Sequence, residues 1–337
     1  MIDPTLSSKI SHFPVMLEEV VKICSPHKGG VFLDCTFGAG GYSKKLLTFA
    51  NTKIIALDRD EQIINISKEI KKRYSKRFSF FQKKFSTLDT VVKDQSVDAA
   101  IFDLGLSSIQ LKDLSRGFSF NSKEKLDMSM GLTSISAEHV INNFSEKSLK
   151  SIIKILGEEK DASIIARQII KERKTKRIIN VYQLVEIIRK SKKNIYKSKI
   201  NPSTKTFQAL RIFVNKEITE LILGIINATK ALKPGGKIVI VSFHSIEDKI
   251  VKYFFSNFSI SKSNPSRYLP DQNKDEYYLF DKYKNKIFVP SKKEIIKNSP
   301  SRSAKLRYAI RNKDQFKYPI ELVNKFKNFI ELESLNV

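Results

Sequence analysis

The fold of this 337-residue chain is indicated most clearly by residues 31–46, Val31-Phe-Leu-Asp-Cys-Thr-Phe-Gly-Ala-Gly-Gly-Tyr-Ser-Lys-Lys-Leu46. A short apolar run that ends in an acid, residues 31–34, leads into a turn made by Gly38, Gly40 and Gly41. Residues 43–49 then have the composition of a helix. A strand, a glycine turn and a helix in this order are typical of an α/β sheet that binds a ligand at the carboxyl ends of its strands. Such turns commonly hold phosphate, so the carboxylate of Asp34 just before the glycines needs an explanation.

The same alternation of strand and helix continues through the first hundred residues. Apolar runs at 54–57, 78–81 and 98–103 predict three more strands, and residues 61–74 have the apolar spacing of a helix. Asp58 and Asp103 end two of these strands, as Asp34 ends the first. Strands that alternate with helices form parallel sheets. We therefore predict a Rossmann-like, doubly wound α/β sheet with three acids at the edge where ligands bind.

The pattern changes after residue 110 and later returns. Residues 146–156, 161–173 and 181–191 predict helices, and basic residues crowd the later part of this region. We then expect one long helix over 206–232 that Pro234-Gly-Gly236 stops, a strand over 237–243, a helix over 246–255 and a closing strand over 304–310. Residues 259–300 are predicted to be rich in loops. The predicted division is a discontinuous cofactor-binding domain (1–110 and 206–313), an inserted all-helical domain (111–205) and a C-terminal surface tail (314–337).

Charge and composition narrow the class of protein. Lys and Arg number 61 against 35 Asp and Glu, a net charge of +26, which attracts polyanions such as nucleic acid. Drift in composition toward Lys, Ile and Asn is the alternative explanation. The two cysteines form no CxxC pair, so we expect neither a disulfide framework nor a metal site. With no run of about 18 apolar residues and no signal pattern, we expect a cytoplasmic protein without membrane spans.

The acids beside the glycine turn identify the ligand. A dinucleotide would bring its pyrophosphate next to Asp34, which is unfavourable. S-adenosylmethionine carries a cationic sulfonium and no phosphate, so carboxylates around it are attractive or neutral. Asp58 lies twenty residues after Gly38, which suits a carboxylate that binds two ribose hydroxyls. The pattern favours S-adenosylmethionine, with Asp34, Gly38 and Gly40 among its contacts. A nicotinamide or flavin cofactor stays open, as does a structural turn in which Asp34 caps the next helix.

A family resemblance covers the chain from about His12 to Arg307. It is carried by HFPVM (12–16), DCTFGAGGYS (34–43), ALDRD (56–60), FDLGLSSIQL (102–111), RGFSF (116–120), LDM (126–128), GEE (157–159), TFQALRIFVN (206–215), PGG (234–236) and SFHSIEDKIVK (242–252). With these motifs the chain resembles the bacterial 16S rRNA (cytosine-N4)-methyltransferases of the RsmH (MraW) kind. The resemblance implies methylation of the exocyclic N4 of one cytidine, with small-subunit rRNA or the small ribosomal subunit as partner. A homo-oligomer stays open.

The resemblance also implies which residues contact the cofactor. The turn amides would approach the methionine end, Asp58 the ribose, and Phe85 the adenine; core packing is the alternative for Phe85. The full implied set is Gly40, Gly41, Tyr42, Asp58, Phe85, Asp103 and Gln110. The chain departs from the family pattern at four positions: Tyr42 replaces a His, and Ser129, Lys205 and Pro300 each stand where the family has an arginine.

The chemistry of N4 methylation needs an acceptor for a proton, because the lone pair of this amine is delocalised into the ring. DNA amino-methyltransferases place a Pro-Pro-aromatic motif after the fourth strand, whereas Leu104 to Ser108 follow Asp103 here. We expect His244, at the end of the fifth predicted strand, to accept the proton or orient the base. Ser107 and Ser242 are its expected hydrogen-bond partners. A structural role for His244 is the alternative, and His12 is a candidate to line the pocket.

Candidate RNA contacts are basic residues in and near the motifs. They are Arg116, Lys205, Arg211, Lys249, Arg302 and Arg307, and ordinary solvated surface charge is the alternative for each. The residues by themselves support a methyltransferase that acts on nucleic acid. Two other functions stay open: a methyltransferase for DNA or protein, and a non-catalytic RNA-binding protein with this fold.

Overall fold

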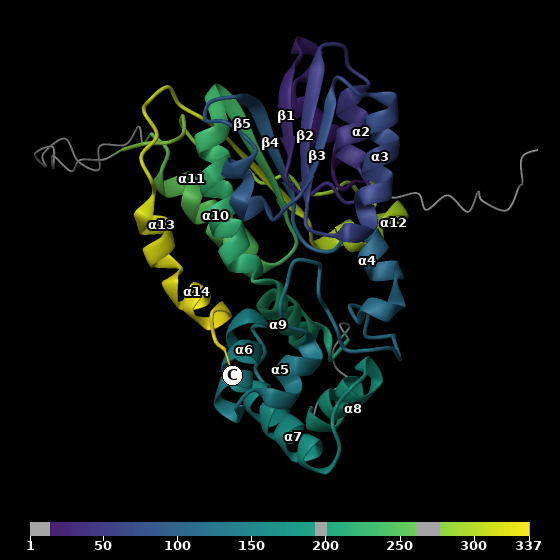
Figure 1. Ribbon diagram of the computed structural model, residues 1–337. Helices are drawn as coiled ribbons and strands as arrows, with labels where there is room; N and C mark the ends of the chain where they lie inside the picture. Colours follow the sequence, from purple (N-terminus) through teal and green to yellow (C-terminus); the bar gives the residue numbers. More distant parts are fainter. Residues whose placement is uncertain (1–13, 193–200, 261–276, 337) are drawn as a thin grey trace, which may run out of the picture.

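The computed structural model describes residues 14–192, 201–260 and 277–336. Its centre is a six-stranded sheet in the order β3-β2-β1-β4-β5-β6 (Figure 1). The strands are β1 (Gly30–Asp34), β2 (Thr52–Asp58), β3 (Phe78–Gln82), β4 (Val97–Asp103), β5 (Leu232–Ser242) and β6 (Lys305–Ile310). The first five are parallel, and β6 pairs antiparallel with β5. The predicted doubly wound α/β sheet is therefore confirmed, with one antiparallel strand at its edge.

Successive residues of each strand point to opposite faces of the sheet and pack into two separate layers of core. Phe32, Ile101 and Val239 face the layer formed with α1 (Leu17–Cys24), α2 (Gly41–Leu47) and α3 (Ile64–Arg73). Leu33, Ala100 and Ile238 face the layer formed with α10 (Glu217–Ala231) and α11 (Ser245–Asn257). This alternation follows from the two-residue period of a strand. Figure 1 shows α2 and α3 on one side of the sheet and α10 and α11 on the other.

The segment between β4 and β5 is helical. It begins with α4 (Ser108–Lys112), and α5 (Ala137–Asn143), α6 (Glu146–Leu156), α7 (Ala162–Thr175), α8 (Val181–Ser191) and α9 (Thr204–Asn215) form a bundle below the sheet (Figure 1). The predicted helices over 146–156 and 181–191 have the predicted bounds. No strand of the sheet lies among the described residues of this segment. Helix α9 packs on α6 and α5, so the bundle includes residues that the predicted division assigned to the other domain.

The single long helix predicted over 206–232 is wrong. The chain forms α9 and α10 instead, with Lys216 between them in the left-handed region (φ 52°). Buried Asn215 explains the break, because its side chain accepts a hydrogen bond from the Met130 amide and donates to the Met128 carbonyl. The helix also ends at Ala231, and Pro234-Gly-Gly236 lies inside β5. Apolar spacing continues through the break, so the sequence pattern did not reveal it.

The C-terminal tail is more buried than its prediction as a surface helix implied. It forms two short helices, α13 (Ile320–Lys325) and α14 (Lys327–Glu333), and α14 packs on α10, α6 and α9. Leu322, Phe326 and Glu333 are buried. Within the segment predicted to be rich in loops, α12 (Lys292–Lys297) forms, while residues 261–276 lie outside the described residues. The described helices include none that is long and apolar enough to cross a membrane.

Candidate functional site

A cavity of about 560 Å³ opens at the carboxyl ends of β1, β2, β4 and β5, next to the switch point between β1 and β4. Its wall combines the glycine turn, the acids that end β2 and β4, the loop from Leu104 to Lys112, and the start of α10. The segments around Phe243 and Lys297 complete it. This is the position at which open parallel sheets bind ligands. His12, a candidate for its lining, lies outside the described residues.

The glycine turn has the geometry that the sequence predicted. Gly38 (φ 51°) and Gly40 (φ 75°) have positive φ, which glycine adopts without strain. Gly41 faces a different constraint, because a Cβ there would lie 2.5 Å from Cγ of Pro14. Gly38, Gly41 and Tyr42 line the cavity, whereas Gly40 is the N-cap of α2 and packs against Phe37. At Gly38 and Gly41 the backbone itself therefore forms the cavity wall, with no side chain between it and a ligand.

Asp58 ends β2 and faces the cavity. Its Oδ2 accepts a hydrogen bond from the Gly38 amide at 2.8 Å, and its Oδ1 accepts one from the Asp60 amide at 2.9 Å. Burial raises the pKa of Asp58 to about 6, although these amides lower it in part. Each carboxylate oxygen retains a second lone pair. Asp58 therefore fixes the turn and can still accept hydrogen bonds from two neighbouring hydroxyls.

Asp34 does not line the cavity. It is fully buried under the turn, where its Oδ2 accepts a hydrogen bond from the Ser43 hydroxyl at 2.6 Å. The Ser43 amide, in the first turn of α2, also bonds to this carboxyl. Burial raises the pKa of Asp34 to about 6. These contacts are those of the helix-capping alternative, and they leave Asp34 an electrostatic neighbour of the site.

Asp103 is the last residue of β4, and its pKa is raised further than those of Asp34 and Asp58. Its Oδ1 is buried and has no hydrogen-bond partner among the described residues, and the residue lines the cavity. Burial raises the pKa of Asp103 to about 8, with help from the charge of Asp34, and the Tyr42 hydroxyl lowers it only in part. A charge held in such surroundings without a cation beside it is unfavourable. A cationic or N–H-bearing ligand group in the cavity would stabilise its ionised form.

Phe85, Gln110 and Ser107 also line the cavity. Phe85 packs edge-on against Phe102 at 5.5 Å between ring centroids, so it is both a wall of the cavity and part of the core. Gln110 donates from Nε2 to Asp60 at 2.8 Å and accepts the Ser107 amide at 3.0 Å. Its amide is therefore engaged in holding the 104–112 loop against the end of β2.

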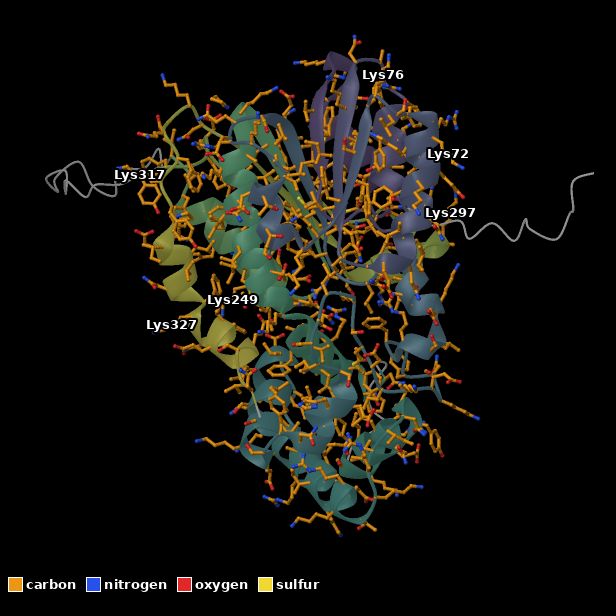
Figure 2. The ribbon with its side chains drawn as sticks, viewed as in Figure 1. Lys72, Lys76, Lys249, Lys297, Lys317 and Lys327 are labelled. Atoms are coloured by element: carbon orange, nitrogen blue, oxygen red, sulfur yellow. The ribbon has the colours of Figure 1, made fainter. Side chains whose placement is uncertain are left out.

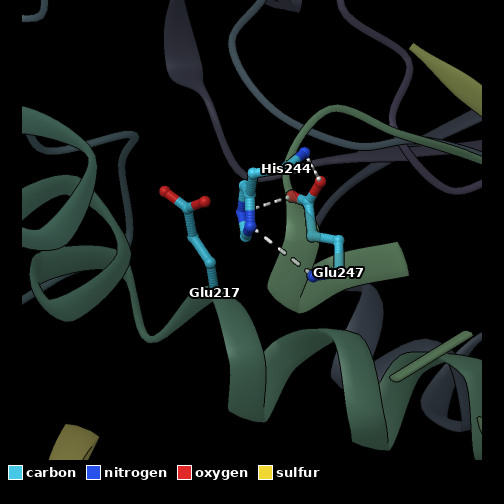
Figure 3. A group of neighbouring side chains, drawn as sticks. All are labelled: Glu217, His244 and Glu247. Carbon is cyan, nitrogen blue, oxygen red and sulfur yellow. Dashed lines mark hydrogen bonds and ion pairs between the residues drawn. The ribbon is translucent and has the colours of Figure 1, made fainter. Parts of the chain in front are cut away.

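A second polar group lies across the cavity, where α10 and α11 begin. Glu217 and Glu247 line the cavity, and the His244 ring lies between them (Figure 3). Arg211 donates from Nε and Nη2 to the two carboxylate oxygens of Glu217 at 2.8 and 2.9 Å. Oε2 of Glu247 accepts the amides of Phe243 and His244 at 2.7 and 3.3 Å. We call Arg211, Glu217, His244 and Glu247 the helix-junction cluster.

Neighbouring charges lower the pKa of Glu247 below its ordinary value, despite a burial that opposes this shift. His244 and Arg211 are the charges responsible. Nε2 of His244 lies 3.1 Å from Oε1 of Glu247, an ion-pair distance that lacks the alignment of a hydrogen bond. Potential ligand atoms of Glu217, His244 and Glu247 lie within 4.8 Å of one another, close enough for a metal ion. Arg211 already supplies the cation there, so we assign no metal to the cluster.

The three catalytic candidates have different positions. Ser107 lines the cavity and is the N-cap of α4. His244 is the N-cap of α11 and contacts the cavity only through Glu247. Ser242 is buried, and its hydroxyl donates to the Lys305 carbonyl at 3.3 Å. The sequence reasoning missed Glu217 and Glu247, although Glu247 lies inside the quoted motif SFHSIEDKIVK.

The six candidate RNA contacts divide into paired and exposed residues. Arg116 pairs with Asp60, Arg211 with Glu217 and Arg307 with Asp248, and all three side chains are largely buried. Lys205, Lys249 and Arg302 are exposed, although Lys205 donates to the Glu158 carbonyl. Arg116, Arg211 and Arg307 thus form ion pairs inside the protein.

Other basic residues surround the molecule and the cavity. The labelled lysines of Figure 2 lie on several sides, from Lys76 near β3 to Lys327 on α14. The labelled lysines therefore do not share a single face. Four lysines also line the cavity: Lys83, Lys84, Lys112 and Lys297.

Comparison with known proteins identifies what the chain is similar to. The model of the MraW methylase family matches residues 9–312. A relative from Rickettsia akari (strain Hartford), named ribosomal RNA small subunit methyltransferase H, is 43% identical over 305 residues, 89% of this chain and 98% of the relative. A relative of the same name from Rickettsia canadensis (strain McKiel) is 44% identical over 300 residues, 89% of this chain and 97% of the relative.

Solved structures are more distant. An rRNA methylase from Streptococcus thermophilus is 10% identical with a TM-score of 0.39, and covers 87% of this chain and 96% of its own. A SAM-dependent O-methyltransferase from Thermotoga maritima is 10% identical with a TM-score of 0.35, over 89% and 66% of the two chains. At these TM-scores the likeness supports no functional inference.

Proposed function

The chain belongs to the MraW methylase family, and from that premise we propose that it methylates the exocyclic N4 of a cytidine in small-subunit rRNA. S-adenosylmethionine is the methyl donor in this enzyme class. The coarser function, rRNA methylation, rests on the family and on the names of the relatives. The cytidine and its N4 atom rest on the resemblance of motifs and on the carboxylates of the cavity. The cytoplasm, where rRNA is modified, is the proposed compartment.

The residues of the glycine side fit the proposed cofactor. The place of Asp103 carries this part, because a half-buried acid that lines the cavity and has no ion pair among the described residues suits a cationic ligand group. Gly38, Gly41 and Tyr42 would hold the methionine end, Asp58 the ribose, and Phe85 the adenine. S-adenosylmethionine supplies an electrophilic methyl group when bound. Asp34 would act through the field it exerts on Asp103 and through α2.

The helix-junction cluster would bind the cytosine. Carboxylates accept hydrogen bonds from the N4 amino group of cytosine. Glu217, Glu220 and Glu247 line this side, and of these Glu217 and Glu247 belong to the helix-junction cluster. A hydrogen bond from N4 to such an oxygen draws electron density onto the nitrogen and fixes its direction. Because the pKa of Glu247 is lowered, Glu247 is an acceptor that remains ionised at neutral pH.

A neutral His244 would receive, through Glu247, the proton that N4 loses, and the resulting imidazolium would lie beside the Glu247 carboxylate. Nε2 of His244 lies 3.1 Å from Oε1 of Glu247, so a proton accepted at Glu247 has the imidazole ring within reach. Ser107 lines the opposite wall and would orient the base, while buried Ser242 would support the strand end that carries His244. The cytidine must leave its stack to enter the cavity. The exposed Lys205, Lys249 and Arg302, with Lys112 and Lys297 of the cavity wall, would contact phosphates; the paired Arg116, Arg211 and Arg307 would shape the site.

Nucleoside mapping of small-subunit rRNA tests this function. Deletion of the gene should abolish N4-methylcytidine at one position, and the purified protein with S-adenosylmethionine should restore it on rRNA or subunits from the deletion strain. An unchanged N4-methylcytidine level in the deletion strain would overturn the assignment. Restoration of a methyl group on a different nucleoside would keep the family and correct the target.

A further inference from the structure

The N-terminus of α10 is held by a residue from the other end of the chain. Helix α10 begins after Lys216, which offers no side-chain cap and has the left-handed conformation that non-glycine residues rarely adopt. The first amides of a helix have no partner inside the helix. Here the Ile218 amide donates to Oε1 of Glu333 at 2.9 Å, and the Thr219 amide donates to Oε2 at 2.8 Å. The Thr219 hydroxyl donates to the same oxygen at 2.6 Å.

Glu333 is therefore a fully engaged carboxylate, not an incidental surface acid. It is the last residue of α14 and is 1% exposed. Its helix packs on α10 and also on α6 and α9 of the bundle. Figure 1 shows α13 and α14 running along α10 toward the bundle. The carboxylate thus fastens the junction at which the bundle meets the cavity.

Glu217, a residue of the cavity wall, lies at this junction. Glu217 immediately precedes Ile218, and Arg211 of α9 holds both of its carboxylate oxygens. The position of Glu217 depends on the direction in which α10 leaves Lys216. The family match ends at residue 312, so the segment that supplies Glu333 follows it. The family motifs quoted above all lie before that segment, so they give it no function.

We propose that Glu333 is a positioning residue for methyl transfer: its carboxylate fixes the start of α10 and thereby the orientation of Glu217 in the cavity. The described C-terminal segment 313–336 thus contributes to the geometry of the site. The inference rests on the proposed function, since it assigns Glu217 to the substrate side. Glu333 itself does not line the cavity.

The test compares Glu333→Gln with Glu331→Gln in the full chain. The glutamine retains the size of Glu333 but presents one amide group that cannot accept both backbone hydrogen bonds. Glu331 lies on the same helix, exposed and paired with Lys327, and is the matched control. We expect Glu333→Gln to lower kcat for rRNA methylation about tenfold, and Glu331→Gln to change it less than about twofold. The affinity for S-adenosylhomocysteine should stay unchanged in both variants.

A double-mutant cycle with Glu217→Gln separates positioning from general stability. If Glu333 acts through Glu217, Glu333→Gln should lower kcat by less than about twofold once Glu217 is already glutamine. Its effect on the melting temperature should persist in that background. A full tenfold loss in both backgrounds, or a lower melting temperature with unchanged kcat, would overturn the inference. A wild-type protein that does not methylate rRNA would instead overturn the proposed function, and faster amide exchange at residues 216–220 in Glu333→Gln would still register the cap.

Discussion

The acids on the two sides of the cavity differ in how their charge is balanced. On the glycine side, Asp34, Asp58 and Asp103 form no ion pair with described residues, and burial raises their pKa values to about 6, 6 and 8. At the helix junction, His244 and Arg211 lower the pKa of Glu247 although its side chain is buried. Among the described residues, internal cations thus pair with the cavity acids of the helix junction but not with Asp34, Asp58 or Asp103.

This difference indicates two kinds of binding. A carboxyl that lacks an internal cation gains most from a positively charged ligand, as expected for the amino-acid end of S-adenosylmethionine. A carboxylate held by a guanidinium, as in Glu217, or by backbone amides, as in Glu247, changes little on binding and is suited to accept a hydrogen bond in a fixed direction. The glycine side should therefore govern cofactor affinity, and the helix junction should govern the chemical step.

The largest expected effect tests the helix junction. His244→Asn retains a side chain that can cap α11 but cannot take up a proton at neutral pH. We expect kcat to fall by about 100-fold, which is typical for the loss of a general base, with the affinity for S-adenosylhomocysteine unchanged. Single-turnover kinetics with calorimetry on the same preparation measures both. Equal losses in kcat and in cofactor affinity would remove the proposed division between the two sides.

Asp103→Asn is the matching change on the glycine side and should have the next largest effect. The substitution preserves volume but removes the charge that a cationic ligand group would meet. A hydrogen bond to a charged group contributes about 1.5–3 kcal/mol, so we expect S-adenosylhomocysteine to bind about 10- to 100-fold more weakly. Calorimetry checks this value, and filter binding of rRNA should stay within about twofold. Undiminished cofactor affinity would show that the unpartnered oxygen faces something else.

The sequence could predict the glycine side because its signals are local. Each of the three acids ends an apolar strand, and Gly38 and Gly40 lie directly after the first strand, so adjacency in the chain reports adjacency in space. For Asp34 the sequence left two roles open, since chain position cannot tell whether an acid faces the ligand or the next helix. In the structure it bonds to Ser43.

The helix junction could not be predicted in the same way. Arg211, Glu217 and Glu247 come from three helices, and their contacts depend on the break at Lys216, which an unbroken apolar pattern conceals. The cap from Glu333 lies more than a hundred residues away in the chain. Arg116 and Arg307 show the same limit, because an arginine near a motif looks free until its internal carboxylate is known.

A smaller effect is the pH dependence of cofactor affinity. A cationic ligand group binds the ionised form of Asp103, and because the pKa of this carboxyl is raised to about 8, the ionised fraction grows as pH rises toward 8. Affinity for S-adenosylhomocysteine should therefore increase between pH 6 and 7.5, by up to about tenfold per pH unit, and level off above pH 8. Asp103→Asn should lose this slope. A flat profile in the wild-type protein would contradict the assignment of Asp103.

Asp34→Asn should have the smallest effect on cofactor affinity. It tests whether Asp34 contacts the ligand directly or acts only through Asp103. The amide oxygen can still accept the Ser43 hydroxyl, so α2 keeps its cap, and Asp34 does not touch the cavity. Affinity for S-adenosylhomocysteine above pH 8 should change less than about threefold. The charge of Asp34 does, however, contribute to the raised pKa of Asp103. Its removal should shift the pH midpoint of cofactor binding downward, so that the variant binds more tightly than wild type at pH 6.5. A large loss of affinity at every pH would instead restore Asp34 to direct contact with the ligand.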